Sequence, residues 1–148
     1  MDMQLEERLP RELSDYVDLM NRERKHLVCG MMAPEFIECD PVAMTQTYAY
    51  PAQVWEQNPD GVLHGGIITT MLDTTIGALT HIITGKLTPT ISLNTNYLRP
   101  APGDGRIIVK AYVTKMGRTL IYTRGELWEE KHPEKLIATA EGTYRNMT

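Results

Sequence analysis

The spacing of hydrophobic and polar residues changes character along the chain. Near the N-terminus, apolar side chains recur every three or four positions opposite a charged face, which predicts an amphipathic helix with Pro10 in its first turn. A later run, Ile67 to Ile83, consists almost entirely of apolar, small and Thr residues, which predicts a helix enclosed by other structure. The apolar stripe of the first helix contains Leu13, Tyr16, Val17 and Met20.

Five other segments alternate between apolar and polar residues, and this period of two predicts strands. The strands are expected at residues 42–50, 90–99, 106–115, 119–129 and 135–145. Short turns separate the last four, as expected of an antiparallel meander. One helix packed on an antiparallel sheet makes an α+β domain. A single sheet can cover every side of that helix only by curling around it.

The segment at residues 29–41 contains Gly and two Pro residues and is expected to be an extended connection. A chain of 148 residues has the size of one domain and can bury a substantial core. The expected organisation is an N-terminal helix and extended lead-in at residues 1–41, followed by the α+β domain at residues 42–148.

Composition and charge narrow the functional classes. A hydrophobic content of 42% is typical of a soluble globular protein, and a net charge of −4 argues against nucleic acid as the main partner. The N-terminus is acidic without an apolar signal segment, so Cys29 and Cys39 are expected to be reduced thiols in the cytoplasm. The four His residues are scattered, so neither a metal site nor a cofactor is expected. The run from Ile67 to Ile83 is short and contains Asp73, which argues against a membrane span.

A turn and two glycines precede the apolar helix. Asn58 begins an N-P-D-G turn, and His64, Gly65 and Gly66 stand where the helix starts. The first backbone N–H groups of a helix lack internal partners and lie at the positive end of its dipole. Glycines allow another group to approach that backbone, so the position suits an oxyanion or a polarised carbonyl. The alternative is that the two glycines only form a turn.

Asp73 is the only carboxylate within the apolar run. An ionised carboxylate in such a helix is unfavourable unless it has a partner or a function, the alternative to a catalytic role being a hydrogen bond to Thr or backbone. Asp73 lies seven residues after Gly66, which places it roughly 10 Å further along the axis. One carbonyl group cannot easily contact both groups. A second, antiparallel copy of the helix would bring them together, which predicts a dimer with shared sites.

The combined motif resembles a known family. The pattern N-P-x-G-x-x-H-G-G, the downstream Asp73 and the strand T-I-S-L-N-T-N-Y-L-R-P are similar to those of hotdog-fold acyl-CoA thioesterases. The resemblance is greatest to the phenylacetate-pathway and 4-hydroxybenzoyl-CoA thioesterase-like branch and covers roughly residues 42–146. It implies a curved antiparallel sheet wrapped around the helix, subunits joined edge to edge as a dimer and a dimer of dimers, and hydrolysis of an acyl-CoA thioester.

The resemblance also implies roles for individual residues. Gly65 would supply the oxyanion N–H, and Asp73 of the partner subunit would act as nucleophile or general base. Asn58 and His64 would position the thioester or water, and Thr90 would orient the water. The coenzyme A or acyl group would contact Gly66, Leu72, Arg99, Lys115, Gly117 and Arg118. The cations among these suit phosphate groups, although exposed solubilising charges are an equal alternative.

Two other functions remain open at this point. One is a hotdog dehydratase or hydratase acting on enoyl thioesters, whose His and acid are normally placed differently. The other is a non-catalytic acyl-CoA-binding protein. The arrangement of H-G-G followed by Asp73 favours hydrolysis over dehydration or hydration. The negative net charge and the absence of an evident helix-turn-helix pattern in residues 1–41 argue against a non-catalytic acyl-CoA sensor.

Overall fold

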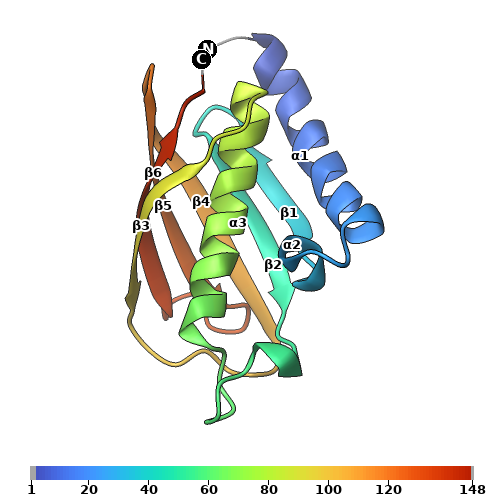
Figure 1. The fold of residues 1–148 in the computed structure, drawn as a ribbon, viewed down its shortest axis with the longest axis vertical. Helices are drawn as coiled ribbons and strands as arrows, with labels where there is room; N and C mark the ends of the chain where they lie inside the picture. The colour runs from blue at the N-terminus through green and yellow to red at the C-terminus, as the bar shows by residue number, and fades with distance from the viewer. Residues whose placement is uncertain (1–2, 148) are drawn as a thin grey trace.

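The structure is a computed structural model, and it describes residues 3–147. Within this range, six strands form one antiparallel sheet in the order β1-β2-β4-β5-β6-β3. The sheet curves around the central helix α3, and α1 packs beside α3 and against β1 (Figure 1). The elements are α1 (Met3–Glu23), α2 (Val28–Met31), β1 (Glu35–Asp40), β2 (Thr45–Pro51), the 3-10 helix η1 (Val54–Glu56), α3 (Gly65–Thr84), β3 (Thr90–Tyr97), β4 (Arg106–Met116), β5 (Leu120–Glu129) and β6 (Ala138–Arg145).

This is the hotdog arrangement that the resemblance implies. The five expected strands are all present, with ends that differ by a few residues from the expected ones. The segment before residue 42 contributes a sixth strand, because Phe36 of β1 pairs with Tyr48 of β2. The sheet therefore extends across the boundary expected at residue 42.

Helix α1 differs from the expectation at its start. It begins at Met3, so Pro10 lies inside the helix and not in its first turn. Proline removes one helical hydrogen bond and normally weakens a helix. Here the helix continues because its apolar stripe, which extends back to Leu9, is buried on both sides of Pro10. The buried residues are Leu9, Leu13, Val17 and Met20.

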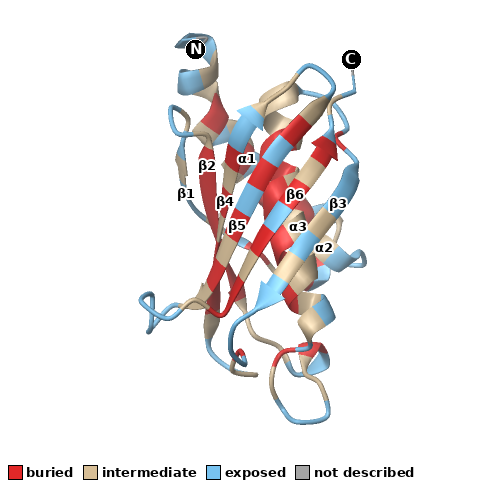
Figure 2. Cartoon of the chain, turned by 90° about the vertical axis from the view of Figure 1, so that its left-hand side faces the viewer, coloured by how far each residue is buried: buried red, intermediate tan, exposed pale blue. Residues whose placement is uncertain are grey.

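Helix α3 forms the centre of the core. Figure 2 shows buried residues along α3 and on the strands that face it. At 20 residues α3 is long and apolar enough to meet the length and composition criteria of a membrane span, which differs from the expectation that it would fail them. The core helix of a folded domain meets the same criteria, and α3 lies on the concave face of the sheet with α1 beside it (Figure 1). Eight of its 20 residues are buried, so a single chain leaves one face of α3 uncovered, which differs from the expectation of a fully enclosed helix.

Small residues on the sheet let α3 approach closely. A Cβ atom on Gly125 of β5 would lie 2.9 Å from Leu72 Cδ2 and 3.2 Å from Ile76 Cδ1. A methyl group there would overlap the end of the Leu72 side chain, which would have to shift. Glycine at this position therefore lets the turns of α3 on either side of Asp73 lie close to the sheet.

Candidate active site

The loop before α3 is held by two side chains of the predicted motif. Asn58 Oδ1 accepts hydrogen bonds from the backbone N–H of Asp60 at 2.9 Å and of Val62 at 3.3 Å. His64 is the N-cap of α3, and its Nδ1 accepts from the Gly66 N–H at 2.9 Å. Since His64 Nδ1 accepts this hydrogen bond, neutral His64 carries its own proton on Nε2. Both side chains thus shape the start of α3.

Gly65 is the first residue of α3. Within residues 3–147 no hydrogen bond to its N–H is found, whereas the N–H of Gly66 is taken by His64. The Gly65 carbonyl accepts from Tyr97 Oη at 3.0 Å, and a Cβ at Gly65 would lie 3.4 Å from the Tyr97 ring. Gly65 therefore presents a free donor at the positive end of the helix dipole.

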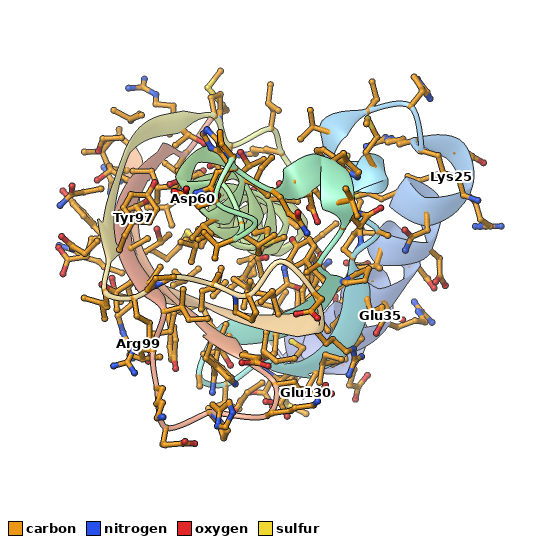
Figure 3. The ribbon with its side chains drawn as sticks, turned by 90° about the horizontal axis from the view of Figure 1, so that it is seen from below. Lys25, Glu35, Asp60, Tyr97, Arg99 and Glu130 are labelled. Atoms are coloured by element: carbon orange, nitrogen blue, oxygen red, sulfur yellow. The ribbon has the colours of Figure 1, made fainter. Side chains whose placement is uncertain are left out.

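A hollow of about 520 Å³ opens beside this donor. Asn58, Gly65, Tyr97 and Arg99 are among its lining residues. Figure 3, which looks along the molecule from below, shows Asp60 over the start of the helix and Tyr97 and Arg99 on the β3 side. The structure thus brings together three of the predicted site residues, Asn58, Gly65 and Arg99.

Asp73 lies two turns further along α3 and is half-buried. Thr90 Oγ1 and Tyr144 Oη both donate to Asp73 Oδ1, each at 2.7 Å. No described residue donates to Oδ2, which leaves that oxygen free to react. Burial, together with the Asp73 carboxylate, raises the pKa of the Tyr144 hydroxyl far above its usual value, so Tyr144 remains a donor at any physiological pH.

A second hollow, of about 250 Å³, contains Asp73. Thr90 and Tyr144 line it together with residues of the N-terminal helices, including Tyr16 of α1 and Cys29 of α2. The N-terminal segment therefore forms one wall of the Asp73 hollow.

The two hollows lie at opposite ends of strand β3. Thr90, its first residue, binds Asp73, and Tyr97, its last residue, binds Gly65. Gly65 and Asp73 are eight residues apart on one continuous helix, about 12 Å along its axis. A single chain therefore presents the donor and the carboxylate as two separate half-sites.

Comparison with known proteins identifies the family. A sequence profile of the thioesterase superfamily matches residues 60–135, just over half of the chain. The chain belongs to the thioesterase superfamily. The match begins in the turn before α3 and includes Gly65, Asp73 and Thr90, whereas Asn58 and Tyr144 lie outside it.

One curated relative and two solved structures illustrate what the chain is similar to. Human acyl-coenzyme A thioesterase 13 is 35% identical over 88 residues, which are 58% of this chain and 61% of the relative, so less than two thirds of that protein is matched. A phenylacetic acid degradation-related protein of Ralstonia eutropha is 29% identical, with a TM-score of 0.75 over 88% of this chain and 99% of the other. Thioesterase superfamily member 2 of Mus musculus has a TM-score of 0.77 at 19% identity, over 93% of this chain and 96% of the other, and shows the fold alone.

Other predicted contact residues of this superfamily member lie apart from one another. Leu72, expected at the substrate, is fully buried against β5 because it points to the sheet side of α3. Leu72 is therefore a core residue and the expectation is wrong. Gly66 lies at the start of α3, with its N–H already bonded to His64.

The predicted cations also fall at two ends of the sheet. Lys115 pairs with Tyr122 and stands at the end of the sheet where β3 begins, as do Gly117 and Arg118 in the turn that follows β4. Arg99 follows the end of β3, about 25 Å away along the strand direction. One chain therefore does not bring Arg99 and the Lys115–Arg118 turn together.

Two tyrosines of the site were not predicted from the sequence. Tyr97 and Tyr144 each bind a predicted site residue through the hydroxyl group. Tyr144 shares one face of β6 with Ala138, Ala140 and Gly142, all of them buried. A tyrosine on a face of small residues that meets a helix carrying one acid was a usable signal, because a buried hydroxyl needs a partner.

Proposed function

We propose that this protein is an acyl-CoA thioesterase, which hydrolyses an acyl-CoA thioester to the free acid and coenzyme A. The observation that carries the proposal is the Asp73 carboxylate, with Oδ1 fixed by Thr90 and Tyr144 and Oδ2 unbonded by any described residue. Membership of the thioesterase superfamily and the similarity to acyl-coenzyme A thioesterase 13 support this reading. The reaction needs only water in addition to the groups of the chain.

The chemistry follows from the two half-sites. The Gly65 N–H would donate to the thioester oxygen and stabilise the negative charge that develops there. Asp73 Oδ2 would either attack the carbonyl carbon or take a proton from an attacking water. In both routes the C–S bond breaks, the hydroxyl group of water ends on the acyl carbon, and the proton ends on the coenzyme A sulfur.

A second copy of the chain would complete each site. Strand β3 is an edge strand of the sheet, with one side free to pair. If β3 paired antiparallel with β3 of a second copy along its full length, Thr90 of one copy would lie beside Tyr97 of the other. Because Thr90 binds Asp73 and Tyr97 binds Gly65, this pairing would join the donor of one copy to the carboxylate of the other.

The same pairing would place the cations together. Arg99 of one copy would come to the end of the sheet that carries the Lys115–Arg118 turn of the other, where both could contact coenzyme A phosphates. We therefore propose a homodimer as the smallest active unit, with a dimer of dimers as the larger assembly. The cytoplasm is the proposed location, and the unpaired thiols of Cys29 and Cys39 suit its reducing conditions.

The test is thiol release from a panel of acyl-CoA thioesters by the wild-type protein and by Asp73→Asn. The asparagine keeps the size and the Oδ1 acceptor but removes the charge, so we expect the turnover number to fall at least a hundredfold. Equal rates would exclude the role given to Asp73, and absence of release from every thioester would favour a binding protein. Sedimentation at micromolar concentration should show a dimer or larger, and a monomer would exclude the shared site.

A further inference from the structure

Two hollows meet along the groove between α1 and α3. The first is the Asp73 hollow of about 250 Å³, and the second, of about 400 Å³, is lined by Arg24, His81 and Leu87 among others. Tyr16, Gly77 and Thr88 line both hollows. These three residues therefore mark the constriction between them.

The Tyr16 ring is held in place at this constriction. The Arg24 guanidinium carbon lies 5.8 Å from the ring centroid, within the range of a cation–π contact. The His81 ring lies at 5.5 Å and is tilted by 55°. His81 is itself fixed, because its Nδ1 bonds the Lys86 carbonyl at 2.7 Å, and a carbonyl can only accept. Tyr16 thus forms a supported partition and not a freely rotating surface side chain.

Gly77 is a glycine that the fold does not require. It lies inside α3 one turn after Asp73, and a Cβ there would meet only Tyr144 Cε1, at an ordinary contact distance of 3.7 Å. Its φ is helical, so no left-handed backbone demands glycine. Glycine within a helix is less favourable than alanine. Because Gly77 has no side chain, the space in front of it stays open, and this space is the floor of both hollows.

We propose that the Asp73 hollow binds the acyl group, that Tyr16 closes its far end, and that Gly77 keeps its floor open. This inference rests on the proposed thioesterase function and adds a substrate class to it. A cavity of roughly 150 Å³ is enough for benzene, so the Asp73 hollow of about 250 Å³ suits a short to medium chain or a single ring. A long fatty chain would have to pass Tyr16 into the second hollow.

The proposal predicts opposite effects for two substitutions. Tyr16→Ala joins the hollows, so kcat/KM for palmitoyl-CoA should rise relative to hexanoyl-CoA by about tenfold or more. Gly77→Leu fills the floor, so kcat/KM for hexanoyl-CoA should fall relative to acetyl-CoA by about tenfold or more. Asp15→Ala, on the exposed side of α1, is the matched control and should leave both ratios unchanged. The wild type should prefer hexanoyl-CoA to palmitoyl-CoA.

Melting temperatures and the mass in sedimentation test whether Gly77 instead has a structural role. Gly77→Ala should melt at the same or a higher temperature than the wild type, since the helix gains and the packing allows a methyl group. Gly77→Leu should keep the wild-type mass in sedimentation, and dissociation would assign Gly77 to a contact between copies and overturn its role here. Unchanged acyl ratios in Tyr16→Ala, with turnover intact, would overturn this inference alone. Absence of turnover by the wild type with every thioester would overturn the proposed function as well.

Discussion

Tyr144 and Asp73 are 71 residues apart in the chain, and the Tyr144 hydroxyl donates a 2.7 Å hydrogen bond to Asp73 Oδ1. Thr90 donates to the same oxygen at the same distance. Two donors on one carboxylate oxygen leave the other oxygen without a partner among the described residues. They also restrict rotation of the carboxylate, so in the proposed mechanism its geometry would be fixed before substrate binds.

Removal of the Tyr144 hydroxyl should slow the reaction without weakening substrate binding. A hydrogen bond to a charged group is worth about 1.5–3 kcal/mol, so Tyr144→Phe should lower kcat by roughly ten- to a hundredfold with little change in KM. Steady-state thiol release measures both constants. Tyr122→Phe, at an exposed tyrosine of β5, is the control and should match the wild type. An unchanged kcat in Tyr144→Phe would mean that Thr90 alone orients the carboxylate.

Thr90 can be tested by a pair of substitutions that differ only in the hydroxyl group. Thr90→Val keeps the shape but loses the donor, so kcat should fall by about tenfold or more. Thr90→Ser keeps the donor and should retain most of the activity. If serine and valine had equal effects, the methyl group and not the hydrogen bond to Asp73 would be the important part of Thr90.

Shared sites predict recovery of activity in mixed dimers. Gly65→Pro removes the free N–H at a helix position that tolerates proline, and Gly65→Ala is the control that keeps it. Gly65→Pro and Asp73→Asn should each be inactive alone. Random mixing after unfolding and refolding should restore about a quarter of the wild-type rate, because half of the dimers then hold one intact site. No recovery in sedimentation-verified mixed dimers would show that both groups act within one chain.

Glu56 is a buried acid outside the two half-sites. Its side chain is fully buried, Oε1 accepts from the Gln53 N–H at 2.7 Å, and Oε2 has no partner among the described residues. Burial raises the pKa of Glu56 from 4.5 to about 7, although the bond from Gln53 opposes the shift. The folded state therefore binds this proton more tightly than the unfolded state.

The direction of the pH effect follows from that difference. Below pH 4.5 Glu56 is protonated in both states, and above pH 7 it is charged in both, so its burial is destabilising by about 3 kcal/mol on the alkaline side only. The free energy of unfolding should fall by this amount between pH 4.5 and 7, relative to Glu56→Gln. Urea unfolding at several pH values measures it, and parallel curves for the two proteins would contradict the prediction.

Addition of a single methyl group between α3 and β5 should lower the stability of the protein. Gly125→Ala would place Cβ 2.9 Å from Leu72 Cδ2, and overpacking of this kind destabilises by about 1–3 kcal/mol. The midpoint of urea unfolding should fall accordingly. Since α3 carries Asp73, activity should fall as well, in contrast to Gly77→Ala, where the helix has room. An unchanged midpoint would show that α3 can shift away from the sheet.

Much of the fold was readable from local pattern. The period of two located five strands, and the uninterrupted apolar run located α3, although a single chain leaves one face of that helix uncovered. Strand β1 was missed because its residues alternate poorly and it follows a Pro-containing segment. The N-terminal helix was predicted, but its turns before Pro10 were missed, because the weakness of proline is local, whereas the burial that offsets it is tertiary.

The residues of the candidate site also divide into those that the local sequence predicts and those that depend on tertiary structure. Gly65 and Asp73 could be found because glycines at a helix start and an acid in an apolar helix are unfavourable without a purpose. Tyr144 could have been connected to Asp73 through its place on a face of small residues, but Tyr97 could not be connected to Gly65, since the pairing of β3 with β6 decides which strand ends lie beside α3. The burial of Leu72 likewise depends on which side of α3 faces the sheet.

Different elements of the fold orient the Asp73 carboxylate and shape the hollow that we propose for the acyl group. Asp73 is anchored from β3 and β6, whereas Tyr16 and Cys29 belong to α1 and α2, and α1 makes most of its strand contacts with β1, at the opposite edge of the sheet. Mutations that reshape the N-terminal helices can therefore change which acyl group is accepted while Thr90, Tyr144 and Asp73 keep their geometry. In this architecture, new substrates are accessible to selection without loss of the chemistry.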